Sequence, residues 1–153
     1  MGWYFEEFAL GREVVTVRRT LTESDVATFS GLSGDFNPLH TDEIFATEAG
    51  FGGRIAHGPM VLGMALGLGA RAGLFDGTVL GMLGVEWTFL AAVRPGDTLG
   101  ATIAVMDARE SRKPDRGIVG LRFEIHNQHQ VLVQRGYTKI LFKRKPATQP
   151  TQA

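Results

Sequence analysis

The stretch from Met60 to Ala70 constrains the fold more than any other, because it carries no polar side chain. A helix that is apolar all round is a buried helix. Pro59 suits the first position of such a helix, where its missing N–H costs nothing and its φ is already helical. We therefore predict a buried helix over this stretch.

The same apolar run is too short to cross a membrane. The uncharged segment extends from Ile55 to Ala70 and contains four glycines and a proline, whereas a membrane-spanning helix needs roughly 18–20 apolar residues. Gly63 and Gly67 lie four residues apart on one face of the helix, and each costs about 1 kcal/mol relative to alanine. We expect a sheet or another helix to approach closely at these two glycines.

In the second half of the chain the hydrophobic pattern changes from helical to alternating, which is typical of strands with one covered face. A turn at Arg94–Asp97 and a hairpin at Asn127–Gln130 separate these strands, and the last one extends over Val131–Phe142. Short connections between consecutive strands predict an antiparallel sheet. The alternating apolar residues before the last strand are Val85, Trp87, Phe89, Leu99, Ala101, Ile103, Val105, Val119, Leu121, Phe123 and Ile125.

Short helices are predicted before these strands. Val14–Val17 suits a first strand or an extended lead-in. Thr22, with Asp25 three residues later, has the spacing of a helix N-cap, and Thr41–Glu43 resembles a second one. Helices early, strands late and one apolar helix available to be wrapped by the sheet indicate an α+β fold.

Length and composition exclude several classes of protein. A chain of 153 residues is typical of one domain, which we place at 1–145, with a disordered tail at 146–153. Lys and Arg together number 16, and so do Asp and Glu together. This balance gives no electrostatic reason to expect nucleic acid or a membrane as partner. Cysteine is absent, which excludes thiolate metal sites and Cys nucleophiles. No secretory signal is evident, and we expect a cytoplasmic protein.

The segment Ser33–His40 concentrates residues that carry chemistry. Gly34 and Pro38 shape its backbone and keep it from continuing a helix. We therefore predict a curved loop that brings Asp35 and His40 together. Neutral imidazole accepts a proton near neutral pH, and a neighbouring carboxylate can orient a water and exchange a second proton. Around one water this pair would form a hydration or dehydration device, unless Asp35 only caps a turn and His40 only fills a gap.

Other kinds of site have less support in the sequence. A metal site would require several of the four histidines to converge, and we predict no metal, because His126 and His129 fit a solvated turn. For His57 we favour a structural role, a hydrogen bond that holds the loop. Ser33 lacks the pattern of a nucleophile elbow and fits a cap or a turn. Asn37 fits an internal hydrogen-bond brace of the loop.

Gly58 immediately precedes the apolar helix, whose N-terminus presents free N–H groups and partial positive charge. Such a position stabilises a developing oxyanion. Because Pro59 has no N–H, the donor must be Gly58 or a residue one turn further in. An ordinary helix start is the alternative. Acid, base and oxyanion donor together would suit attack of water on an α,β-unsaturated thioester.

The residues from Phe29 to His40, continuing into Ala46, resemble the signature of the MaoC-like (R)-specific enoyl-CoA hydratases and dehydratases. The core of that motif, Gly-Asp-x-Asn-Pro-x-His, is specific and ends at His40. Gly53–Gly58 and Val93–Asp97 also look familial, and the resemblance covers most of residues 10 to 143.

The resemblance implies a hot-dog fold, an antiparallel sheet wrapped around a long helix at Pro59–Ala72. It also implies that Asp35 and His40 hold the catalytic water and that the Gly58 amide binds the thioester oxygen, with Asn37 and His57 in support. No metal or redox cofactor is implied. The substrate would be a thioester of coenzyme A or of acyl carrier protein, and the protein would be a homodimer.

Two alternatives remain open, and one departure from the family pattern favours the non-catalytic one. Some members carry a hydroxyl residue on the second turn of the helix, where this chain has Gly63–Leu66. A hot-dog thioesterase is the alternative among enzymes. A non-catalytic subunit that binds acyl thioesters is the alternative from another class.

Overall fold

The computed structural model describes residues 1–146, so nearly all of the tail predicted at 146–153 lies outside the described residues. Within these residues lie six strands, four α-helices and two short helical turns of other types, η1 (Phe5–Glu7) and η2 (Thr47–Phe51). The helices are α1 (Glu23–Ser33), α2 (Pro38–Thr41), α3 (Glu43–Ala46) and α4 (Gly58–Arg71). The strands are β1 (Glu13–Val15), β2 (Arg19–Thr20), β3 (Val79–Phe89), β4 (Thr98–Glu110), β5 (Arg116–His126) and β6 (Leu132–Lys143).

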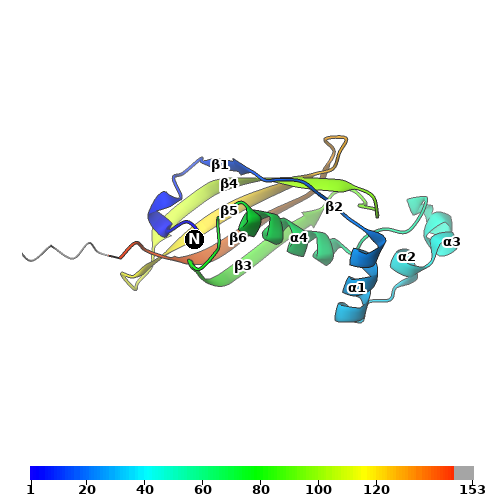
Figure 1. The fold of residues 1–153 in the computed structure, drawn as a ribbon, viewed down its shortest axis with the longest axis horizontal. Coiled ribbons are helices and arrows are strands. Elements are labelled where there is room, and N and C mark those ends of the chain that lie inside the picture. The colour runs from blue at the N-terminus through cyan, green and yellow to red at the C-terminus, as the bar shows by residue number, and fades with distance from the viewer. Residues whose placement is uncertain (147–153) are drawn as a thin grey trace, which may run out of the picture.

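A single antiparallel sheet curves around α4, with its strands in the order β1-β4-β5-β6-β3 and β2 paired to the start of β4 (Figure 1). The predicted α+β class and the hot-dog fold are confirmed. The core consists of inward-facing strand residues and one side of α4. They include Leu99, Ala101, Ile103, Val119, Leu121, Phe123, Ile125, Ile140, Phe142, Val61 and Ala65.

The helix α4 is buried on one side only, which corrects the expectation drawn from its composition. It begins at Gly58, one residue before the predicted start, and ends at Arg71. A Cβ atom at Gly63 or Gly67 would meet no described atom within 4 Å, so the predicted close approach at these glycines is wrong within this chain. Both lie on the face of α4 that the sheet does not cover. The close approach occurs at Gly69, where a Cβ would lie 2.7 Å from the Phe75 ring.

The helices α1, α2 and α3 form a lobe beyond the end of the sheet, next to the N-terminus of α4 (Figure 1). The predicted N-cap at Thr22 is confirmed. Its hydroxyl accepts from the Asp25 N–H at 3.2 Å, and the Asp25 carboxylate accepts from the Thr22 N–H at 2.8 Å. Gly34 ends α1 with a φ of +76°, a left-handed conformation that glycine adopts without strain.

Two glycines let aromatic side chains lie flat across the sheet. A Cβ on Gly136 would lie 1.7 Å from the Trp87 ring, so the indole occupies the space above that glycine. On the outer face Tyr137 crosses Gly120 in the same way, and its hydroxyl donates to Asp107. Burial, together with the neighbouring Asp107 carboxylate, raises the pKa of Tyr137 to about 12.

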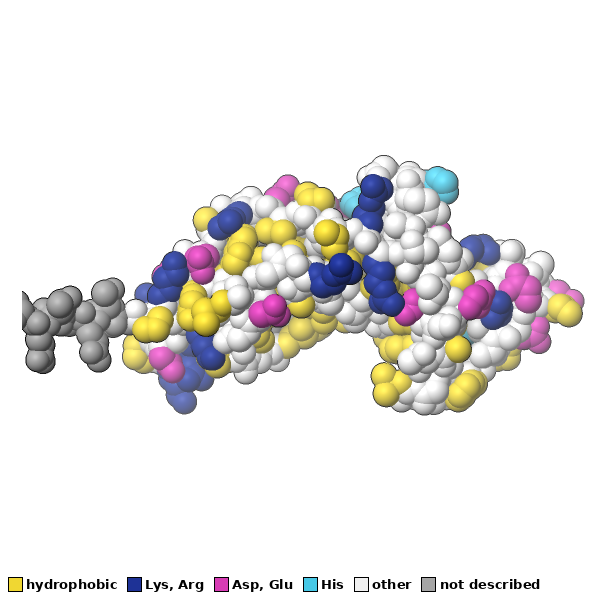
Figure 2. Space-filling view, viewed as in Figure 1, with side chains coloured by type: hydrophobic (Ala, Val, Ile, Leu, Met, Phe, Trp, Pro, Cys, Tyr) yellow, Lys and Arg dark blue, Asp and Glu magenta, His cyan; other side chains and the backbone are white. Residues whose placement is uncertain are grey.

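No described helix is long and apolar enough to cross a membrane. Basic and acidic side chains are interspersed over the face that Figure 2 shows. The charge distribution of this face therefore offers no extended basic area.

Replacing Gly136 with alanine is expected to destabilise the fold, because the new methyl group would overlap the Trp87 ring. Overpacking of this kind costs typically 1–3 kcal/mol, so we expect a loss of about that size in the free energy of unfolding. Urea unfolding monitored by tryptophan fluorescence measures it.

Gly31→Ala is the matched control, because a Cβ there would meet nothing within 4 Å. Its position inside α1 predicts a gain of roughly 0.5–1 kcal/mol. Equal stability of Gly136→Ala and the parent protein would contradict the packing of Trp87 across this glycine.

Candidate active site

Three residues that the sequence analysis singled out meet where the lobe joins α4. Asp35 lies in the loop after α1, His40 on α2, and His57 is the N-cap residue of α4. The sequence analysis predicted a loop up to His40. This is wrong for the end of the segment, because α2 begins at Pro38. Asn37 caps that turn by accepting from the Leu39 N–H at 3.0 Å, and a proline at the first helical position assists it.

The carboxylate of Asp35 and the imidazole of His40 face each other, with Oδ2 and Nε2 3.9 Å apart. A water at normal hydrogen-bond distance, about 2.8 Å, from each atom fits between them. His40 Nδ1 lies 2.8 Å from the Ile55 carbonyl oxygen. Because a carbonyl only accepts, Nδ1 carries the proton and Nε2 presents its lone pair toward Asp35.

His57 lies beneath this pair and is 1% exposed. Its ring packs against that of His40, with centroids 3.7 Å apart and the ring planes tilted by 32°. Nε2 lies 3.0 Å from the Asp35 carbonyl oxygen, so this nitrogen carries the proton and donates. The hydrogen bond ties the Asp35 loop to the start of α4. His57 Nδ1 is buried and has no partner among the described residues.

The same three side chains place possible metal-ligand atoms within 4.8 Å of one another. His57 Nε2 faces a carbonyl and therefore holds a proton, which removes its lone pair from coordination. Asp35 and His40 remain, fewer than the three protein ligands typical of a catalytic zinc site. The geometry suits a bound water better than a metal ion.

Gly58 begins α4 beside this cluster. Among residues 1–146 no atom accepts a hydrogen bond from its N–H. A Cβ at this position would lie 2.7 Å from the Phe89 ring, so any larger residue would require that ring to move. The exposed end of a helix dipole and a free N–H make this position suitable for binding a negatively charged oxygen.

His40 lies between two cavities. One, of about 360 Å³, is mainly apolar and contains His40, Gly58, Phe89 and Gln134 in its wall. The other, of about 380 Å³, lies between α1 and α2 and includes Arg54. A ligand whose reacting carbon lies at His40 can therefore extend to both sides of the imidazole.

Arg54 fastens the lobe on which Asp35 and His40 lie. Its guanidinium donates to Glu43 of α3 at 3.1 Å and to Glu23 of α1 at 3.0 Å. The Arg54 N–H also donates to Glu43. The hydrogen bonds from the Arg54 backbone and side chain hold the pKa of Glu43 below its usual value. The contact with Glu43 likewise raises the pKa of Arg54.

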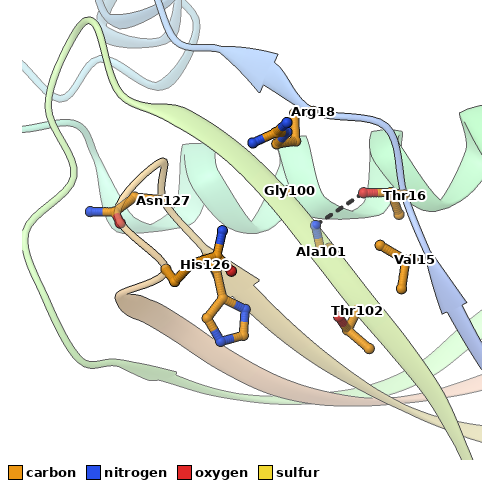
Figure 3. Close-up of a pocket in the computed structure, with 9 residues that line it drawn as sticks. Val15, Thr16, Arg18, Gly100, Ala101, Thr102, His126 and Asn127 are labelled. Atoms are coloured by element: carbon orange, nitrogen blue, oxygen red, sulfur yellow. Dashed lines mark hydrogen bonds between the residues drawn. The ribbon is translucent and has the colours of Figure 1, made fainter.

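The structure separates the remaining histidines from this site. His126 lies beside Arg18 and Gly100 in another hollow, of about 390 Å³, at the β5–β6 hairpin (Figure 3). His129 is exposed on the same hairpin. Neither histidine is part of the Asp35 cluster. The predicted solvated turn is confirmed for His129 but is wrong for His126, which is the half-buried last residue of β5.

Sequence reasoning missed two participants. One is the Ile55 carbonyl, which orients His40 but has no signature in the sequence because every residue has a carbonyl. The other is Gln134, which lines the cavity that contains Gly58. Its signal is a polar residue at an inward-facing position of the last strand.

Comparisons with known proteins concern the sequence and the fold of this chain. A family model described as MaoC like domain matches residues 6–124. A relative named (R)-specific enoyl-CoA hydratase, from Rhodospirillum rubrum, is 38% identical over 67% of this chain and 69% of its own length. Protein MaoC of Klebsiella aerogenes is 43% identical over 63% of this chain, which spans 28% of that protein. The crystal structure of a MaoC-like dehydratase from Rhodospirillum rubrum has a TM-score of 0.83 at 29% identity, covering 95% of this chain and 100% of that one.

Replacing Arg54 with methionine is expected to lower the urea midpoint of unfolding at pH 7, because both glutamates lose their partner. The pKa of Glu43 is depressed in the folded state, so its contribution exists above the unfolded value of 4.5 and disappears as the pH falls through the folded value. The difference between Arg54→Met and the parent should therefore shrink on acidification to about pH 3.

Arg71→Met is the matched control, since Arg71 is exposed at the end of α4 and none of the ion pairs of the described residues includes it. It should change the midpoint little at either pH. A difference for Arg54→Met that stays constant from pH 7 to pH 3 would contradict the role of the glutamates.

Proposed function

This chain belongs to the family of MaoC-like domains, and we propose that it is an acyl-CoA hydratase/dehydratase that adds water reversibly to a trans-2-enoyl thioester. The observation that carries the proposal is the 3.9 Å separation of Asp35 Oδ2 and His40 Nε2, with the Nε2 lone pair directed at the gap. The name of the Rhodospirillum relative, (R)-specific enoyl-CoA hydratase, supports the same reaction class.

In this proposal Asp35 and His40 hold one water and move its protons. The water oxygen forms a bond to C3 of the enoyl group, the electron pair of the C2–C3 double bond forms a new C1–C2 double bond, and the electron pair of the thioester C=O double bond moves onto its oxygen. Asp35 and His40 together accept a proton from the water and return one to C2, so that a 3-hydroxyacyl thioester forms. The reverse sequence dehydrates it. Such acid/base assistance contributes typically 10²–10⁴-fold to a rate.

Gly58 would bind the thioester oxygen on which negative charge accumulates. Its free N–H lies at the positive end of the α4 dipole, and a preorganised donor of this kind stabilises the enolate more than the ground state. The wall of the cavity around Phe89 is mainly apolar, and an apolar ligand that covers it would strengthen this interaction by displacing water. Asn37 and His57 would hold Asp35 and His40 in place.

A non-catalytic subunit that binds acyl thioesters is the second candidate. The residues of the second turn of α4, Gly63–Leu66, carry no hydroxyl, so none of these side chains can hydrogen-bond a water in the site. Acyl-CoA binding without turnover would favour this candidate. Release of free coenzyme A from a saturated acyl-CoA would instead identify a thioesterase.

His40→Ala is expected to reduce the hydration of crotonyl-CoA by roughly 10²–10⁴-fold, because it removes one partner of the catalytic water. Asp35→Asn, which keeps the shape of the side chain, should have an effect in the same range. Loss of the enoyl absorbance measures the rate, and circular dichroism checks that the variants fold.

The control is His129→Ala, the same substitution on the exposed β5–β6 hairpin. It should hydrate crotonyl-CoA at the parent rate. A folded His40→Ala protein with undiminished turnover would refute the proposed function.

We also propose a homodimer formed through β3. This strand pairs with β6 on one side and has no strand partner on its other side within residues 1–146. Apolar side chains along it are exposed, among them Leu83 at 54% and Met82 at 43%. A long apolar edge strand is a template for pairing with another chain. A second copy of β3 in antiparallel orientation would pair with its free backbone N–H and C=O groups.

Leu83→Lys is expected to dissociate the dimer, because it places a charge in the apolar contact. Light scattering should then give the mass of one chain, 16.6 kDa, where the parent protein gives twice that value. Val15→Lys is the matched control, since Val15 is 77% exposed on β1 at the opposite edge of the sheet. A parent protein of 16.6 kDa would contradict the proposal.

A further inference from the structure

Gln134 is a polar side chain in an unusual place, because it is 2% exposed on the inner face of β6. A buried amide is costly unless its donors and acceptors are paired. Both ends of this amide are paired. Its oxygen accepts from the Trp87 indole N–H at 2.8 Å, and its nitrogen donates to the Gly58 carbonyl at 3.3 Å.

The indole N–H fixes which way the amide points. A tryptophan side chain can only donate, so the group that faces it must be the carbonyl oxygen of Gln134. The amide nitrogen is then directed toward Gly58, whose carbonyl can only accept. Trp87 therefore sets the orientation of Gln134, and Gln134 holds Gly58.

The register of β3 and β6 creates this arrangement. Gln134 pairs directly with Phe89, and Gly136 pairs with Trp87. The glycine lets the indole lie flat, which brings its N–H to the neighbouring Gln134. Phe89 meanwhile packs against the Cα of Gly58. Gly58 is thus held by an aromatic ring and by an amide from two adjacent strands.

We propose that Gln134 and Trp87 are positioning residues that orient Gly58, so that its N–H meets the thioester oxygen in the transition state. This inference rests on the proposed function. Gln134 holds the carbonyl of the same residue whose N–H is free, and this limits rotation about the Gly58 backbone. A donor displaced by a fraction of an ångström loses much of its value for the transition state.

The first variant is Gln134→Met, which keeps the length of the side chain and removes its donor and acceptor. We expect kcat for crotonyl-CoA hydration to fall roughly 10- to 100-fold, with KM changed less than twofold. Trp87→Phe removes the indole donor and keeps an aromatic ring over Gly136. It should lower kcat less than Gln134→Met does, and it should have no further effect in the Gln134→Met background.

A spectroscopic measurement reports the donor directly. Butyryl-CoA, which has no double bond to hydrate, carries the same thioester carbonyl, and labelling that carbon with carbon-13 isolates its stretching band. The frequency of the bound carbonyl should be lower than in solution for the parent protein. In Gln134→Met the shift should be smaller, because the Gly58 N–H is less well aimed.

Thr138→Val is the matched control. Thr138 lies on the same face of β6, is fully buried, and its hydroxyl has no partner among the described residues. The variant should keep the parent kcat and carbonyl shift even if its melting temperature changes. If Gln134→Met does not fold, Trp87→Phe replaces it. The kcat and the carbonyl shift of Trp87→Phe then test the same proposal.

Several results would overturn the proposal. One is an unchanged kcat in folded Gln134→Met protein, and another is an equal loss in Thr138→Val. A rise in KM with kcat unchanged would mean that Gln134 contacts the substrate instead. If the parent protein binds butyryl-CoA but does not hydrate crotonyl-CoA, the proposed function fails. A carbonyl shift that Gln134→Met weakens would in that case still support the role of Gln134.

Discussion

The packing of α4 against the sheet is the constraint on which the rest of the structure depends. It determines where the N-terminus of the helix lies, and Phe89 of β3 packs there against Gly58, leaving no room for a side chain unless the ring moves. The residue before it, His57, is fixed as the cap and reaches the Asp35 carbonyl. Ile55, two residues earlier, holds His40. Both halves of the candidate site are therefore located by one helix end.

Two backbone carbonyls give the two neighbouring histidines different roles. The Ile55 oxygen takes the proton of His40 Nδ1, which leaves Nε2 as an acceptor toward Asp35. The Asp35 oxygen takes the proton of His57 Nε2, which makes that ring a donor to the loop. The centroids of the two imidazole rings are only 3.7 Å apart. Their functions differ because a carbonyl binds Nδ1 of His40 but Nε2 of His57.

The features that could be predicted from the sequence are those that local residues determine. The N-cap at Thr22 and the strands of the antiparallel sheet depend on neighbouring side chains or on alternation. The turn α2 was missed, although Asn37 followed by Pro38 is a helix-start signal, because both residues were interpreted only as shaping a loop. Gly63 and Gly67 were misjudged, since the face of α4 that meets the sheet is a tertiary property. The orientation of His40 depends on a carbonyl, which no residue type marks.

The two halves of the candidate site belong to parts of the molecule with different local stability. Asp35 and His40 lie on the lobe, where the ion pairs of Arg54 are exposed, whereas Gly58 and Gln134 lie where α4 meets the sheet and are joined by a hydrogen bond. Segments with few buried apolar contacts open before the whole domain unfolds. On heating, the lobe should open while the sheet is still intact. Inactivation would then be a reversible, local event that precedes denaturation.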